Sequence, residues 1–215
     1  MKTKYSRLLS VIVLAAVSLA ADASSKSLSA FLAKVSLSQV SFEYSFVMNR
    51  EGAKITGNGS VTLQDDAFRL NGNGLEMWCD GSTSWTVDRS AEEILIQPVE
   101  DSGEDFASNP ALLVASLDKG FSETSGGTSK FNGTAVTTSI LSPKSDVSSM
   151  TEISLLKLYF KESTSDLVGL EVKLNDGSVC VFTISGFKTA EKNSSRAAFR
   201  FDEKIPSNYV VTDLR

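Results

Sequence analysis

Alternation of apolar and polar residues predicts a mainly β (α+β) protein, one antiparallel meander of about ten strands that two helices interrupt. The clearest alternation marks an aromatic strand whose apolar residues are Val40, Phe42, Tyr44, Phe46 and Met48. Turn signals at Asp80-Gly81 and at Asn175-Asp176-Gly177 separate further strands, because glycine accepts a positive φ at no steric cost. No internal repeat or linker-like tract divides the chain, so we expect a single domain.

The first helix is predicted at 24–38, ahead of the aromatic strand. Its apolar residues recur with the i, i+3, i+4, i+7 spacing of one helix face: Leu28, Phe31, Leu32 and Val35. Serines on the N-terminal side of this stripe can cap the helix. We therefore expect an amphipathic helix with one apolar stripe.

Short strands are predicted to follow the aromatic strand as far as Pro98. Each is recognised by apolar residues two positions apart. In chain order these residues are Ile55, Val61 and Leu63, then Phe68 and Leu70, then Leu75, Met77 and Cys79, then Trp85 and Val87, then Ile94 and Ile96.

A second helix is predicted to begin at Asn109-Pro110, with Asn as the cap and Pro at the first helical position. Its apolar body covers residues 111–117, and Gly120 is suited to end it. A helix this short is only marginally stable in water, and it must therefore pack on the rest of the protein. Further strands are predicted at 135–141, 153–162, 167–174, 179–185, 198–202 and 209–214.

Residues 1–23 have the pattern of a cleaved signal peptide: a basic start, a short apolar core at 8–16 and small residues up to Ala23. The core is shorter than the roughly 20 apolar residues of a membrane span. Cleavage would remove three cations (Lys2, Lys4 and Arg7) and one anion (Asp22), which changes the net charge from −5 to −7. Such an acidic chain is unsuited to nucleic acid or to anionic membranes as main partners. We expect a soluble periplasmic protein with one domain at 24–215.

The residue inventory argues against an enzyme. The chain contains no histidine, so a cysteine nucleophile would lack its usual activating base, and a zinc site would lack its usual ligands. We expect no catalytic residue, no metal and no cofactor. The two cysteines, Cys79 and Cys180, lie in predicted strands, and an oxidising compartment would permit a disulfide. The sequence leaves open whether they pair.

Several short features occur in the order typical of one protein family. They are an amphipathic helix that leads into an aromatic strand (Leu28 to Phe46), Gly57-Asn58-Gly59 before Phe68-Arg69, Asp80-Gly81 before Trp85, Asn109-Pro110-Ala111-Leu112-Leu113, Leu141-Ser142-Pro143-Lys144, and the tail Val210-Val211-Thr212-Asp213-Leu214-Arg215. Over residues 24–215 the chain resembles LolA, the periplasmic carrier of outer-membrane lipoproteins, or a divergent branch of that family. One departure is the loop Gln64-Asp65-Asp66, where the family often has an Arg-Pro pair that helps to hold the lid closed.

The resemblance implies an incomplete antiparallel β-barrel with helices as a lid over an apolar cavity. Family members are monomeric carriers that take a triacylated lipoprotein from an inner-membrane transporter and pass it to an outer-membrane receptor. The residues expected to form the cavity and its lid are Leu28, Phe31, Leu32, Phe42, Tyr44, Phe46, Val61, Leu63, Phe68, Leu75, Met77, Trp85, Leu112, Leu113 and Leu117. The alternatives are a carrier of another lipid, or an envelope sensor or interaction protein that uses the same half-barrel.

Reversible binding sets a physical requirement on such a lid. Burial of acyl chains is worth about 0.8 kcal/mol per CH₂, so three long chains would bind far more tightly than non-covalent affinities reach. We expect lid side chains to fill the empty cavity and to be displaced by ligand, which offsets most of this gain. The side chains assigned to this exchange are Phe31, Leu32, Leu112, Leu113 and Leu117.

Overall fold

The computed structural model describes residues 26–50, 52–72, 74–99, 114, 117, 119–145 and 152–215. These residues form an N-terminal helix at 26–37, a short 3₁₀ helix η2 (Arg196–Phe199) and a single large sheet. The strands of the sheet are β1 (Gln39–Arg50), β2 (Ala53–Gln64), β3 (Ala67–Gly72), β4 (Leu75–Cys79), β5 (Thr83–Asp88), β6 (Glu93–Pro98), β7 (Phe121–Phe131), β8 (Thr134–Pro143), β9 (Ile153–Lys161), β10 (Leu167–Leu174), β11 (Val179–Ala190) and β12 (Val210–Asp213).

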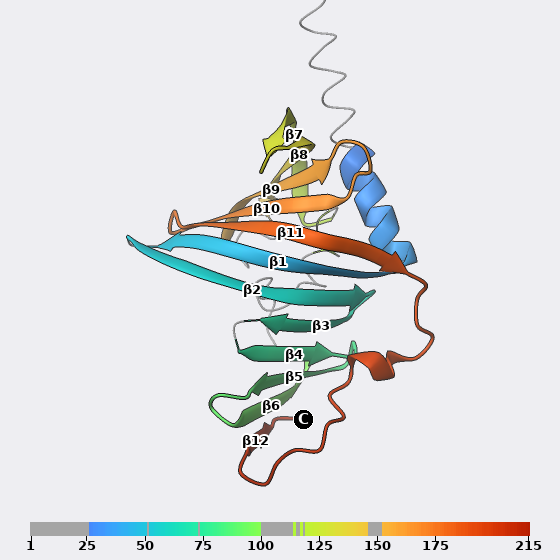
Figure 1. Ribbon diagram of the computed structural model, residues 1–215, viewed down its shortest axis with the longest axis vertical. Helices are drawn as coiled ribbons and strands as arrows, with labels where there is room; N and C mark the ends of the chain where they lie inside the picture. Colours follow the sequence, from blue (N-terminus) through green and yellow to red (C-terminus); the bar gives the residue numbers. More distant parts are fainter. Residues whose placement is uncertain are drawn as a thin grey trace, which may run out of the picture.

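The sheet consists of two meanders joined at one ladder. Its strand order is β12-β6-β5-β4-β3-β2-β1-β11-β10-β9-β8-β7, and β1 pairs with β11 where the two meanders meet. The edge strands β12 and β7 lie at opposite ends of the sheet, which is therefore open (Figure 1). The mainly β, incompletely closed architecture that the sequence analysis predicted is thus confirmed.

The sheet has two apolar faces with different covers. The inner face is the one on which the N-terminal helix packs, and it carries the larger buried cluster. The outer face is apolar over β4, β5 and β6, where the C-terminal residues Phe201, Ile205 and Tyr209 pack against a second cluster. The buried members of that outer cluster are Trp78, Trp85, Val87, Ile94 and Ile96.

Three differences from the expected elements have physical reasons. β7 was not predicted, because its Ser, Thr and Gly residues show little apolar alternation, yet it pairs along β8 as an edge strand. The strand predicted at 198–202 is wrong, since η2 and an irregular segment occupy this region. Finally, β12 runs parallel to β6, so the meander is not antiparallel throughout.

The Asp80-Gly81 turn is confirmed, with a three-residue connection between β4 and β5. The Asp80 carboxylate accepts hydrogen bonds from the backbone N–H of Ser82 (3.0 Å) and of Thr83 (2.9 Å). Gly81 has a φ of 95°, which a residue with a side chain rarely adopts. The turn therefore needs this sequence, in which Asp ties the loop and Gly supplies the unusual backbone angle.

The predicted helix at 109–120 lies mostly outside the described residues, as do residues 1–23. Of its length, Val114 is assigned as helical, and Leu117 is buried in the inner cluster. Within the described part of the chain, no helix has both the length and the apolar character needed to span a membrane.

Candidate functional site: the inner apolar face

Strand register makes the inner face continuously apolar. In one row across the sheet, Val40 of β1 pairs with Leu63 of β2, Leu63 with Phe68 of β3, and Phe68 with Cys79 of β4. In another row Phe46 of β1 pairs with Phe182 of β11, which pairs with Leu170 of β10. Directly paired residues project from the same side of a sheet, so these rows form one surface.

The inner cluster joins this surface to the helix above it. We call its buried sheet residues the floor: Val40, Val61, Leu63, Phe68, Cys79, Phe121, Leu141, Ile153, Leu156, Leu158, Phe160, Leu167 and Ile184. Helix residues Leu28, Phe31 and Val35 and the isolated Leu117 complete the buried set. The floor draws on strands from both meanders, so its shape depends on how the two halves of the sheet are held.

Phe31 is the central contact between the helix and the floor. Its side chain is 2% exposed, and its ring centroid lies 5.6 Å from that of Phe160 and 6.1 Å from that of Phe187. Polar contacts fix the helix at two further points. The Lys34 ammonium binds the Asp166 carboxylate at 2.6 Å, and the Ser27 and Thr137 hydroxyls lie 2.8 Å apart.

Beyond the helix the inner face continues as a half-buried aromatic stripe, which we define as Tyr44, Phe46 and Phe182. Phe182 lies 6.0 Å from Tyr44 and 5.6 Å from Phe46 between ring centroids. On the β2 side, Tyr44 pairs with Gly59 and Phe46 pairs with Gly57, so no side chain covers the rings from that strand.

Tyr44 occupies the space beside Gly59 and beside Gly72, the residue of β3 that pairs with Gly59. A Cβ atom added at Gly72 would meet its hydroxyl oxygen at 2.5 Å, and one added at Gly59 would meet that atom at 2.7 Å. Burial raises the pKa of the Tyr44 phenol, so the group stays neutral at physiological pH. The stripe is therefore an uncharged aromatic surface that leads from the floor toward the β1–β2 hairpin.

The structure brings most of the expected site residues together. Six of them are buried in the inner cluster: Leu28, Phe31, Val61, Leu63, Phe68 and Leu117. Leu32, Phe42, Tyr44 and Met77 are partly buried against it. Phe46 lies outside this cluster and is linked to it through Phe182, which contacts both Phe46 and Tyr44. Leu112 and Leu113 lie outside the described residues, so their role in the lid stays a prediction.

Two expected residues lie elsewhere. Trp85 belongs to the outer cluster, because β5 projects Trp85 and Val87 to the face opposite the floor. Its expected place on the inner face was a misassignment: β4 is apolar on both sides, with Met77 inner and Trp78 outer, and the sequence does not show that Trp85 pairs with Trp78. Leu75 has the parity of Met77 and Cys79 but is 38% exposed at the start of β4 and belongs to neither cluster.

Several residues of the site were not identified from the sequence: Phe160, Phe182, Ile184 and Phe187. In β11, Phe182 and Ile184 alternate with the polar Thr183, which was a signal for these two positions, although the apolar Val179 and Val181 weaken it. Phe187 offered no such signal, because the register of β1 and β11 shifts between Ser41 and Glu43 and changes the alternation there.

The cysteine thiols are free and buried, so the possible disulfide between Cys79 and Cys180 is absent from the structure. Burial raises the pKa of Cys79 and raises that of Cys180 to about 11. Both thiols are thus protonated at neutral pH and poor nucleophiles. Among the described residues, no three His, Cys, Asp or Glu side chains gather into a possible metal site.

An open depression of about 670 Å³ lies over β1, β2, β3 and β11. Among the residues that line it, Glu43, Ser45, Asn58 and Ser60 alternate with the inner-face residues of their strands and so belong to the outer face. Its polar lining is unsuited to acyl chains. The inner face is therefore the better candidate for an apolar ligand.

No protein-family model and no curated protein sequence matches this chain. Its fold is similar to solved structures of very low sequence identity. An uncharacterized conserved protein from Thermus thermophilus is 11% identical with a TM-score of 0.54, over 88% of this chain and 98% of that one. A LolA superfamily protein from Nitrosomonas europaea is 10% identical with a TM-score of 0.43, over 83% and 98%. LprF from Mycobacterium bovis is 11% identical with a TM-score of 0.44, over 80% and 96%. The likeness to the Thermus protein shows a shared fold.

Proposed function

We propose that this protein is a periplasmic carrier that binds the acyl chains of a lipid or lipoprotein on its inner face, between the floor and the N-terminal helix. The observation that carries the proposal is the cover of that face. Among the residues that the structure describes, a broad apolar floor is covered by an amphipathic helix, through Phe31, and all strands belong to the one sheet that carries the floor. A helix that packs through side chains can be displaced without breaking a strand ladder, so acyl chains can take its place.

The energetics of exchange support reversible binding. When acyl chains enter, they gain contact with the floor, but the helix loses the contacts of Leu28, Phe31 and Val35, which are buried there in the structure. Each such side chain is worth about 1.5–3 kcal/mol when it is fully buried. The net affinity for the cargo is the difference between these two terms. A receiver that binds the cargo more tightly can therefore take it from this protein.

The uncharged chemistry of the site fits acyl chains better than a polar substrate. The stripe presents aromatic rings, and the cysteine thiols at the site remain protonated because their pKa values are raised by burial. Transfer of lipoproteins from an inner-membrane transporter to an outer-membrane receptor is the specific role that the resemblance to LolA suggests. We include that role, and cleavage of residues 1–23, in the proposal.

Binding of a fluorescent fatty acid to the protein without residues 1–23 tests the site. Phe46→Ser and Phe182→Ser remove aromatic rings from the stripe, and we expect each to weaken binding by about tenfold. Val47→Ser and Val181→Ser are matched controls, because Val47 and Val181 pair with each other on the opposite face. Equal affinity in the stripe variants and the controls would reject the inner face as the binding site.

The carrier role needs a second experiment. The same protein is incubated with spheroplasts that hold a labelled triacylated lipoprotein in the inner membrane. Appearance of the lipoprotein in the soluble fraction, in a one-to-one complex, is the expected result. Fatty-acid binding without lipoprotein release would retain the acyl site and replace the cargo with another lipid.

A further inference from the structure

The C-terminal segment makes a second connection between the two halves of the sheet. Residues 191–209, which we call the strap, leave β11 in one meander and lead to β12, which pairs with β6 at the far edge of the other (Figure 1). The first connection is the β1–β11 ladder. The halves can therefore change their relative position only if the strap yields as well.

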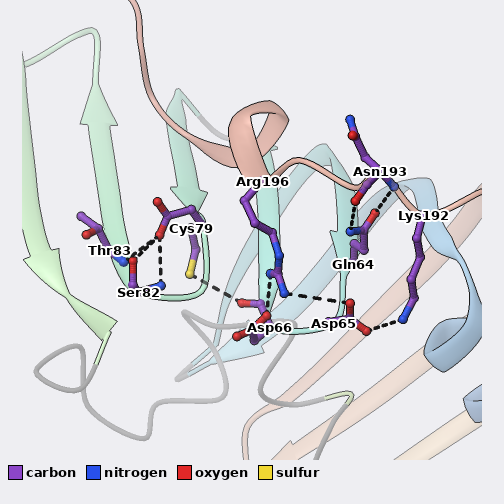
Figure 2. Close-up of polar contacts among 10 residues, drawn as sticks. Gln64, Asp65, Asp66, Cys79, Ser82, Thr83, Lys192, Asn193 and Arg196 are labelled. Atoms are coloured by element: carbon purple, nitrogen blue, oxygen red, sulfur yellow. Dashed lines mark hydrogen bonds and ion pairs between the residues drawn. The ribbon is translucent and has the colours of Figure 1, made fainter.

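The strap is bound to the β2–β3 turn by two reciprocal hydrogen bonds (Figure 2). Gln64 is 3% exposed, its side-chain Nε2 donates to the carbonyl oxygen of Asn193 at 2.9 Å, and its Oε1 accepts from the Asn193 backbone N–H at 2.8 Å. The Gln64 amide thus pairs with the strap as a neighbouring strand would. This contact ties the segment after β11 to the end of β2, across β1.

Ion pairs extend this junction along the strap. Lys192 and Arg196 bind the turn carboxylates Asp65 and Asp66, each at 2.5 Å, and Arg200 lies 3.4 Å from Asp80 in the β4–β5 turn. The three cations recur every four residues and meet acidic residues of the β2–β3 and β4–β5 turns. Figure 2 shows Lys192 and Arg196 at the β2–β3 turn. The side chains of Lys192 and Arg196 are 32% and 38% exposed, so salt can screen these pairs.

The ladder beside this junction contains a natural weak point. The register of β1 and β11 shifts where Ser41 pairs with Lys188 and Glu43 pairs with Ser185, and Gly186 in this interval has a φ of 62°. Bulges of this kind interrupt pairing and let a strand bend. Phe187 lies in the same interval, with its ring centroid 6.1 Å from Phe31 and 6.4 Å from Phe42. A bend at the bulge would therefore move a direct contact of the N-terminal helix.

We propose that the β1–β11 bulge is a hinge and that the strap junction of Gln64, Lys192 and Arg196 is a clamp across it that controls ligand release. With the clamp closed, the halves hold the floor in register and Phe31 remains seated against Phe160 and Phe187. Release of the clamp lets the halves separate at the bulge, which unseats the helix and opens the floor. This inference rests on the proposed binding of acyl chains to the inner face.

The double variant Lys192→Met and Arg196→Met tests the clamp. Its control is Lys204→Met and Arg215→Met, which removes two cations from the same end of the chain. Lys204 is exposed, and Arg215 pairs with Asp213, two residues before it. The readout is the rate at which a bound fluorescent fatty acid transfers to excess phosphatidylcholine vesicles. We expect release about three- to tenfold faster from the clamp variant, since surface ion pairs are individually modest.

The salt dependence of the release rate provides an independent test of the clamp. Release from the unmodified protein and from the control should accelerate between 20 and 500 mM NaCl, because the Debye length then falls from roughly 20 Å to about 4 Å. Release from the clamp variant should be nearly independent of salt. Wild-type release rates and wild-type salt dependence in a folded clamp variant would overturn the inference.

The experiment separates failure of the clamp from failure of the proposed function. If the unmodified protein binds no fatty acid, the proposed function is lost, and the clamp is judged by hydrogen exchange of the β11 amides at 184–190. Faster exchange there in the clamp variant than in the control would support a hinge held by the strap. Equal exchange in the two variants would overturn it.

Discussion

The inner and outer clusters are both apolar surfaces of the same sheet, but they are closed in different ways. The strap reaches the outer cluster after the Gln64–Asn193 hydrogen bonds and several ion pairs, and it leads into β12, which pairs with β6. The N-terminal helix covers the inner floor through apolar side chains, with polar contacts at Ser27 and Lys34. If the proposed site is correct, an apolar face becomes permanent core when backbone pairing fixes its cover, and is available to a ligand when side chains alone hold the cover.

The largest expected effect concerns the outer cluster, whose cover is fixed by backbone pairing. Trp85 is 5% exposed in the outer cluster and pairs with Trp78 across β4 and β5. Trp85→Ala should lower the free energy of unfolding by about 3–5 kcal/mol, as large-to-small core substitutions do. Denaturant titration measures the loss, and fatty-acid affinity of the folded protein should be unchanged. A tenfold loss of affinity at full folding would contradict the separation of the two faces.

Phe31→Ala tests the inner face, whose cover is the N-terminal helix. If the helix is a cover that opens on its own, the main loss should be local and not global. We expect amides of the helix at 26–37 to exchange about tenfold faster or more, while the free energy of global unfolding falls by about 2 kcal/mol or less. Native-state hydrogen exchange measures both quantities. A global loss as large as that of Trp85→Ala would make the helix part of the permanent core.

The sequence was sufficient for most strands of the sheet, because buried positions in a one-sided strand recur with period two. Of the floor residues, however, only Val61, Leu63 and Phe68 had been expected at the site. β4 shows where this rule fails: Met77 faces the inner cluster and the adjacent Trp78 faces the outer one, so both parities are apolar. Because Trp85 pairs with Trp78 and not with Met77, this ambiguity in β4 placed Trp85 on the wrong face, although β5 itself alternates with the polar Ser84 and Thr86. When a strand is apolar on both faces, its sequence does not show which face would bind a ligand.

The strap could not be predicted for a different reason. Its contacts join residues 129 positions apart, such as Gln64 and Asn193, and such long-range polar contacts follow no spacing rule. Phe199 and Phe201 alternate as strand residues would, but neither lies in a strand. Phe199 is buried at the end of η2, and the ring centroid of Phe201 lies 6.2 Å from that of Trp78. The bulge at Gly186 was likewise hidden, because the sequence does not show which strand pairs with β11.

A smaller effect should appear in the pH dependence of the helix cover. Burial acts to raise the pKa of Asp166, but hydrogen bonds from Lys34 and Thr164 outweigh it and hold that pKa below its usual value. The ion pair therefore stabilises the closed helix above the ordinary Asp pKa, and this contribution disappears as pH falls through the lowered pKa, below about pH 4.

Lys34→Met provides the control for that prediction. Both partners are about one-third exposed, so solvent screening limits the contribution to about 0.5 kcal/mol. Hydrogen exchange of the helix amides, corrected for intrinsic rates, should show this loss as pH falls below about 4 in the unmodified protein and not in Lys34→Met. The same pH dependence in both proteins would assign it to other carboxylates.

The smallest expected effect is an absence of change, and it tests the comparison most directly. The chain has two tryptophans, and both lie in the outer cluster, on the face opposite the floor. Saturation with a non-fluorescent fatty acid should not shift the emission maximum of Trp78 and Trp85. The ligand replaces contacts of Phe31 on the inner face, whereas the strap covers the tryptophans both in the empty and in the ligand-bound protein. Phe201→Ala, which removes a ring beside Trp78, should shift the emission to longer wavelength without ligand and so shows that the probe responds. A ligand-induced shift that saturates with binding would mean that the outer cover also moves, and the two faces would then form one coupled lid.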